Sequence, residues 1–254
     1  MLLVLDIGNT NIVLGVYDGD TLTASWRVAT VAERTDDEHV HLVRDLLAGA
    51  GITPDRIEGV IVACVVPRLA DPITGMCEKL FTASPTFVTG DASLGVKIDY
   101  RSPGEVGADR IANAAAAHVL YGCAAIVVDF GTATTFDAVA ADGTYLGGAI
   151  APGIQVATDA LVSRTSQLHS VAFACPASPI GKTTTEGIQS GMYYGLIGLV
   201  EKLVASMREA MGGPVKVIAT GGLAKVIASD CPCIEVVHET LTLEGLRILW
   251  ERRG

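Results

Sequence analysis

Short runs of apolar, β-branched residues alternate along this chain with longer segments in which apolar residues recur at helical spacing. The runs are typical of buried strands, and the longer segments are typical of helices that cover a sheet. The chain opens with an apolar run, a polar loop and a returning run, which predicts a hairpin. After this hairpin the pattern predicts strand 21–30, helix 36–50, strand 57–66, helix 69–81 and strand 86–89.

The rest of the chain repeats this alternation. A polar segment over 95–107, with glycines and a proline, leads into an alanine-rich run that predicts a helix over 108–120. The elements predicted further on are strands near 125–130, 135–140 and 145–150, helices 154–163 and 184–211, strand 215–219, a short helix, strand 234–237 and helix 242–252. The pattern predicts an α/β protein of two lobes, 1–107 and 108–254, each a mixed sheet flanked by helices.

The composition agrees with a well-packed α/β protein and argues against a nucleic-acid-binding, membrane-spanning or secreted protein. Half of the 254 residues are apolar and 18% are charged, so a sizeable core can form. The net charge is -10, and no Lys/Arg-rich run is present, so nucleic-acid binding is not expected. Charges, glycines and prolines interrupt every apolar stretch before it reaches the length of a membrane span, and the first residues lack the features of a signal peptide.

The cysteines are scattered, which indicates reduced thiols and a cytoplasmic location. The nearest pair, Cys231 and Cys233, lacks the spacing of a zinc or thioredoxin site. We therefore expect the six cysteines to fill apolar surroundings rather than to carry chemistry.

One motif occurs twice. The apolar run that ends in Asp6-Ile-Gly8-Asn-Thr returns as the run that ends in Asp129-Phe-Gly131-Thr132. The glycine allows backbone N–H groups to approach an oxyanion, the hydroxyl and amide side chains add donors, and the carboxylate can hold a hydrated cation. A single copy is more often an ordinary turn, but the repetition predicts two loops that bind a polyphosphate.

Two further glycine segments bear on nucleotide binding. The strand over 215–219 runs into Gly221-Gly222 at a helix start, which provides a flat surface for a nucleoside or else is an ordinary strand-to-helix turn. Gly181-Lys182-Thr183 resembles the end of a Walker A loop, but Pro176 stands where that loop requires a glycine. We therefore do not expect a P-loop.

An acid and a base lie together at the start of the alanine-rich helix. Asp109 could complement the helix dipole only, or it could accept a proton from an alcohol during phosphoryl transfer. Arg110 could bind a carboxylate with two parallel hydrogen bonds.

Taken together and in order, these motifs resemble type III pantothenate kinases of the acetate and sugar kinase, Hsp70 and actin superfamily. The match includes Asp6-x-Gly-Asn-Thr-Asn, Tyr100 with Gly107-Ala-Asp-Arg, Asp129-x-Gly-Thr-Ala-Thr-Thr and Thr220-Gly-Gly, and it spans nearly the whole chain. The resemblance implies an actin-like duplicated fold of two ribonuclease-H-like lobes. It also implies ATP-dependent phosphorylation of pantothenate to 4'-phosphopantothenate, the first step of coenzyme A biosynthesis.

The resemblance further implies a role for each motif residue. The ATP phosphates would contact Asp6, Ile7, Gly8, Asn9, Thr10, Asn11, Ile12, Val13 and, from the second lobe, Thr132, and the adenosine would lie on Gly221 and Gly222. Pantothenate would contact Tyr100, Gly107, Ala108, Asp109 as general base, Arg110 and Thr184 of the neighbouring subunit. Asp129 would hold a monovalent cation, K+ or NH4+, and Mg2+ would accompany ATP.

The helix predicted over 184–211 carries apolar residues on more than one face, which together with the resemblance predicts a homodimer with substrate sites at its interface. Two alternatives remain at this point. A different small-molecule kinase of the superfamily would share the phosphate loops, and a nucleotide-sensing regulator would bind ATP without turnover.

Overall fold

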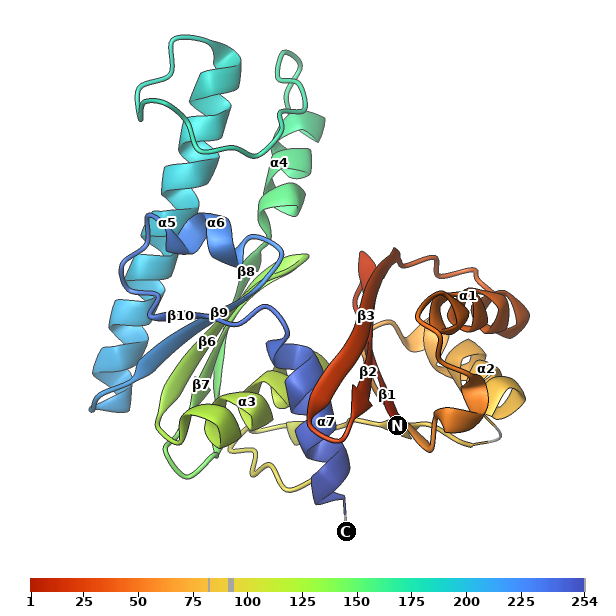
Figure 1. Ribbon diagram of the computed structural model, residues 1–254. Helices are drawn as coiled ribbons and strands as arrows, with labels where there is room; N and C mark the ends of the chain where they lie inside the picture. Colours follow the sequence, from red (N-terminus) through yellow and green to blue (C-terminus); the bar gives the residue numbers. More distant parts are fainter. Residues whose placement is uncertain (82, 91–93, 254) are drawn as a thin grey trace. The chain divides into compact units, whose positions relative to one another are not determined.

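The computed structural model describes residues 1–81, 83–90 and 94–253, which form two compact units (Figure 1). Unit 1 comprises Met1–Tyr121, Gly143–Tyr145 and Thr240–Gly254, and unit 2 comprises Gly122–Asp142 and Leu146–Glu239.

Unit 1 is built on a mixed five-stranded sheet. The strands are β1 (Leu2–Ile7), β2 (Asn11–Asp18), β3 (Thr21–Ala29), β4 (Gly59–Cys64) and β5 (Thr86–Phe87), in the order β3-β2-β1-β4-β5. The first three strands are antiparallel, and β4 and β5 add in parallel. The helices of this unit are α1 (Asp36–Gly49), α2 (Ala70–Phe81), α3 (Ala108–Tyr121) and α7 (Leu241–Arg252).

Unit 2 repeats this topology. Its strands are β6 (Ala125–Phe130), β7 (Ala133–Val139), β8 (Tyr145–Pro152), β9 (Lys216–Gly221) and β10 (Val236–Val237), in the order β10-β9-β6-β7-β8. Read from the β8 edge, this order is that of the first sheet, with β8, β7, β6, β9 and β10 in the places of β3, β2, β1, β4 and β5. Here β9 pairs in parallel with β6, as β4 pairs with β1. The helices are α4 (Ile154–Ser163), the long α5 (Thr184–Met211) and α6 (Ala224–Ala228) (Figure 1).

The main core of each unit lies on one face of its sheet. Leu3, Leu5 and Ile7 of β1 belong to the core that α1 and α2 cover, and every second residue of β6 belongs to the core that α5 and α6 cover. Because side chains alternate along a strand, Asp6 and Asp129 lie on the opposite face of their sheets. Both aspartates are half-buried, and β1 and β6 have the same sequence of buried and half-buried positions.

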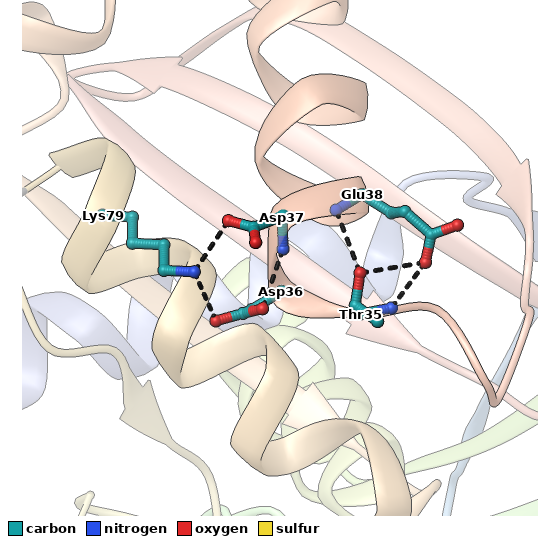
Figure 2. Close-up of polar contacts among 5 residues, drawn as sticks. All are labelled: Thr35, Asp36, Asp37, Glu38 and Lys79. Carbon is teal, nitrogen blue, oxygen red and sulfur yellow. Dashed lines mark hydrogen bonds and ion pairs between the residues drawn. The ribbon is translucent and has the colours of Figure 1, made fainter.

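Polar side chains fix the start of α1 (Figure 2). Thr35 caps the helix as its hydroxyl accepts a hydrogen bond from the Glu38 N–H, while the Glu38 carboxylate accepts one from the Thr35 N–H at 2.8 Å. Lys79 of α2 pairs with both Asp36 and Asp37 at 2.7 Å. The acidic first turn predicted for this helix therefore also joins α1 to α2.

Close packing explains why α3 and α7 belong to unit 1, although the sequence-based division places both in the second lobe. Gly245 of α7 lies so near the Ala112 backbone of α3 that a side chain there would overlap it. The Thr242 hydroxyl donates to the Asn113 side-chain oxygen at 2.9 Å. These helices cover the sheet face opposite α1 and α2, since Leu243 approaches Gly15 of β2.

The predicted elements are confirmed in order, with shorter strands in a few places. The strand predicted over 234–237 begins only at Val236, because Cys231–Ile234 form a turn in which the Ile234 N–H donates to the Cys231 carbonyl oxygen at 3.0 Å. Prolines begin the three short 3-10 helices, Pro54–Arg56, Pro67–Leu69 and Pro103–Glu105. Among the described residues, no helix has the length and apolarity that crossing a membrane would require.

Candidate functional site

The first Asp-x-Gly loop is a tight connection between β1 and β2. The Gly8 N–H donates to the Asn11 carbonyl oxygen at 3.0 Å, which closes the loop. Thr30, just after β3, supports it from outside, since its hydroxyl donates to the Gly8 carbonyl oxygen at 2.7 Å and its N–H donates to the Thr10 carbonyl oxygen at 3.0 Å. Asn9 and Thr10 are exposed at the tip, as a loop that binds an anion requires.

The second loop has the same construction between β6 and β7. The Gly131 N–H donates to the Ala133 carbonyl oxygen at 3.0 Å, and the exposed Thr132 lies at the tip. Gly153, which precedes α4, supports this loop as its N–H donates to the Thr132 carbonyl oxygen at 3.1 Å. The sequence motifs identified both loops and a turn at Pro152-Gly153, but they did not predict that Thr30 and Gly153 support the loops, because these contacts depend on segments that come later in the chain.

Gly221 lies directly beside Asp129 within unit 2. It has a φ of +89°, and a Cβ placed on it would lie 2.6 Å from both Asp129 Oδ1 and the Phe130 carbonyl oxygen. The Gly222 N–H donates to that same carbonyl oxygen at 3.2 Å. The structure thus brings together two residues that the sequence assigned to different ligands, the cation site and the adenosine surface.

This arrangement fits a hard cation. The Asp129 carboxylate oxygen borders the space that a side chain of Gly221 would occupy, and carboxylate oxygens are ligands that hard cations prefer. The Phe130 carbonyl lies side-on to the same space, with its oxygen at 2.6 Å and its carbon at 2.7 Å. Among the described residues, no group of three or more His, Cys, Asp or Glu side chains forms a cluster suited to a metal ion. A cation here would therefore depend on this one carboxylate together with backbone oxygens and ligands supplied by a substrate.

Asp109 is the second residue of α3 in unit 1. Its Oδ1 accepts a hydrogen bond from the Arg110 N–H at 2.9 Å, and a Cβ at Gly107 would lie 2.5 Å from the same oxygen. Burial raises the pKa of the Asp109 carboxyl, while this hydrogen bond and the charge of Arg110 oppose the shift. A carboxylate whose pKa is raised by burial is a better proton acceptor than an exposed one.

Tyr145 connects the predicted substrate residues of unit 1. The Arg110 guanidinium lies 5.7 Å from the centre of the Tyr145 ring, and the Tyr100 ring lies 6.3 Å from it. Tyr145 is fully buried, and its backbone pairs with the segment around Ile98. Sequence reasoning missed Tyr145, because only the fold brings this strand end against the 97–100 segment.

Thr184 belongs to unit 2, where it is the exposed first residue of α5. The segment before it does not form a P-loop. No strand leads into Gly181, and the Lys182 N–H donates to the Glu186 carboxylate at 2.6 Å instead of remaining available to a phosphate. This confirms the prediction from Pro176.

Comparison with known proteins identifies the family. The family model described as type III pantothenate kinase matches residues 2–206. The chain belongs to the type III pantothenate kinase family. The type III pantothenate kinase of Anaeromyxobacter sp. (strain K) is 51% identical over 252 residues, which cover 99% of each chain. Membership of this family of ATP-dependent kinases confirms the predicted function, which is phosphorylation of pantothenate in coenzyme A biosynthesis.

Solved structures confirm the fold class of this kinase. The activator of the 2-hydroxyisocaproyl-CoA dehydratase from Clostridium difficile, solved with bound ADPNP, aligns with a TM-score of 0.56 over 99% of this chain and 95% of that chain, at 12% identity. Component A of the (R)-2-hydroxyglutaryl-CoA dehydratase from Acidaminococcus fermentans aligns with a TM-score of 0.55 over 100% and 99% of the two chains, at 12% identity. At such identities the likeness concerns the fold alone, which is the actin-like duplicated fold.

Proposed function

We propose that the kinase transfers the γ-phosphoryl group of ATP to the primary hydroxyl of pantothenate with Asp109 as the general base. The observation that carries this assignment is the half-buried carboxylate at the start of α3, with its raised pKa and with Arg110 next to it. Arg110 binds the carboxylate or amide end of pantothenate, and Tyr100 and the Gly107-Ala108 backbone complete the pocket. Little covalent chemistry is then required beyond alignment and proton removal.

The two glycine loops bind the phosphates of ATP in this proposal. Residues 6–13 line the phosphates, with the Asn9 amide and the Thr10 hydroxyl at the exposed tip as donors, and Thr132 supplies a second hydroxyl. Gly221 and Gly222 leave a surface without side chains for the adenosine. The closed hairpin loops with exposed polar tips support this assignment.

Cations offset the charge in this proposal. Pantothenate and ATP are anions, and the protein itself carries a net charge of -10. Asp129 would hold a monovalent cation, and Asp6 would hold the hydration shell of Mg2+. When bound, these cations neutralise the phosphate charge that develops during transfer.

A coupled assay for ADP release tests the proposed function. With Mg2+ present, we expect release to require pantothenate and to be much faster with KCl or NH4Cl than with NaCl at equal ionic strength, because the site beside Asp129 must be filled. A panel of other primary alcohols serves as the substrate control. Release of ADP that needs neither pantothenate nor K+ would contradict the assignment.

Arg110→Lys should raise the KM for pantothenate by about 10- to 100-fold with a smaller effect on kcat, because lysine keeps the charge but loses the planar fork. Arg110 is buried beside Tyr145, so lysine also loses the contact with the ring. Steady-state kinetics at saturating ATP measure the effect. Arg44→Lys, an exposed change on α1, is the matched control and should have wild-type kinetics. An unchanged KM in the Arg110 variant would remove Arg110 from the pantothenate site.

We also propose that the kinase is a cytoplasmic homodimer in which Thr184 contacts pantothenate bound by the neighbouring subunit. Large apolar side chains are exposed on unit 2 at the end of β8, on α4 and near the start of α5, and Ile150 and Ile180 are exposed by 67% and 69%. Exposed apolar residues of this kind are typical of subunit interfaces. The cytoplasmic location is inferred from the scattered cysteines, since disulfide frameworks are typical of secreted proteins.

A further inference from the structure

Two cysteines meet at a turn of unit 2 that has no part in the proposed phosphoryl transfer. Cys231–Ile234 lie in the connection between α6 and β10, and the Ile234 N–H donates to the Cys231 carbonyl oxygen at 3.0 Å. Pro232 occupies the second position of this turn, where its fixed φ favours the bend. The turn brings Cys231 Sγ and Cys233 Sγ to 3.3 Å from each other.

This geometry suits a disulfide better than a metal ion. Residues two apart in a bent chain have Cα atoms within about 7 Å, which is inside the range that disulfides span. The sulfurs need to approach by little more than about 1 Å to reach the bonded distance. A structural zinc site needs about four ligands, and among the described residues no cluster offers even three suitable side chains.

The two thiols differ in their access to solvent. Cys231 is fully buried in the core with Ile227 and Ile234, whereas Cys233 is only half-buried. Burial and the neighbouring Cys233 sulfur raise the pKa of the Cys231 thiol, so Cys231 keeps its proton at neutral pH. An oxidant from solvent therefore meets Cys233 first, with Cys231 behind it as the resolving thiol.

We propose that Cys231 and Cys233 form an oxidisable dithiol that a hydroperoxide converts to an intramolecular disulfide. The Cys233 thiolate attacks the peroxide, which forms a sulfenic acid and releases the alkoxide or hydroxide. The Cys231 sulfur then attacks the sulfenic sulfur, and its proton leaves with the sulfenic oxygen as water. The thiols lose two electrons and two protons in total, and the peroxide O–O bond takes up the electrons.

The arrangement also protects Cys233 from further oxidation. A sulfenic acid without a nearby thiol proceeds under excess peroxide to sulfinic acid, which is not readily reversed. With Cys231 already at 3.3 Å, closure competes with this second step. The disulfide can then be reduced by a dithiol, which returns the turn to its original state.

Peptide mass spectrometry of the intact protein after hydrogen peroxide treatment tests the proposal. Trypsin releases both cysteines in one peptide, residues 226–247, and Cys175 alone in another, residues 165–182. After alkylation with N-ethylmaleimide, we expect the first peptide to be about 2 Da lighter than its reduced form and free of alkyl groups. Dithiothreitol before alkylation should restore two alkylation sites. The exposed Cys175 should behave as a single thiol under the same treatment.

Two matched variants separate the roles of the thiols. In Cys231→Ser, the same peroxide dose should carry Cys233 to sulfinic acid, about 32 Da heavier. In Cys233→Ser, the buried Cys231 should remain largely reduced. The proposal is overturned if the wild-type peptide keeps two alkylable thiols, if it crosslinks to the Cys175 peptide, or if wild type and Cys231→Ser form sulfinic acid equally fast. None of these outcomes bears on phosphorylation of pantothenate.

Discussion

Asp109→Asn should lower kcat by about 10²- to 10⁴-fold while the Kd for ATP stays close to that of the wild type, because this change removes proton acceptance and little else. Asparagine has nearly the same shape, and its side-chain oxygen can still accept the hydrogen bond that the Arg110 N–H gives to Asp109 Oδ1 at 2.9 Å. Single-turnover kinetics with a separate ATP titration distinguish lost chemistry from lost binding.

The pH dependence adds an independent readout. Burial raises the pKa of the Asp109 carboxyl, and only the deprotonated form accepts a proton. In the wild type, kcat/KM should therefore fall as the pH is lowered through this raised pKa, at a higher pH than an ordinary carboxyl would give. The Asn variant should lose this acidic limb from its profile.

Asp71→Asn is the matched control for the helix-dipole alternative. Asp71 is the second residue of α2 and follows an alanine, as Asp109 follows Ala108 in α3, but Asp71 is exposed. If an acid in the first turn merely complements the dipole, both variants should lose only a few tenths of a kcal/mol of stability. Wild-type turnover in Asp109→Asn would leave only this structural role and remove Asp109 as the base.

The sequence alone was sufficient to predict the helices and strands and the repetition of the Asp-x-Gly motif. Strands and helices follow from local periodicity, and the two Asp-x-Gly motifs end strands that share one burial pattern. The two Asp-x-Gly loops were predictable as hairpin connections for the same reason, since each joins two strands that are adjacent in the sequence.

Features that depend on distant segments were not predictable. Tyr145 meets Arg110 and Tyr100 only through a backbone pairing with Ile98. The packing of α3 on α7 depends on Gly245, which occurs near the end of the chain and carries no signal by itself. The Cys231–Cys233 pair has no familiar spacing, and only the proline turn reveals how near its sulfurs are.

Gly221→Ala should raise the Kd for ATP by about 10- to 100-fold and should weaken the dependence on K+. The new Cβ would lie 2.6 Å from both Asp129 Oδ1 and the Phe130 carbonyl oxygen, so the carboxylate or the strand end must shift. The residue also has a φ of +89°, which an alanine adopts only with strain. Isothermal titration with ATP and activity assays across KCl concentrations measure the two effects.

Gly212→Ala is the control that separates the effect of backbone strain from the effect of overlap between the new Cβ and its neighbours. Gly212 ends α5 with a φ of +69° and has open space where a Cβ would be added. This control should lose about 1–2 kcal/mol of stability from backbone strain alone and keep its affinity for ATP. Weaker ATP binding in Gly221→Ala but not in Gly212→Ala would assign the loss to the oxygens beside Asp129. An equal Kd for ATP in the two variants would mean that Gly221 is needed only for its positive φ. The adenosine and cation sites would then lie elsewhere.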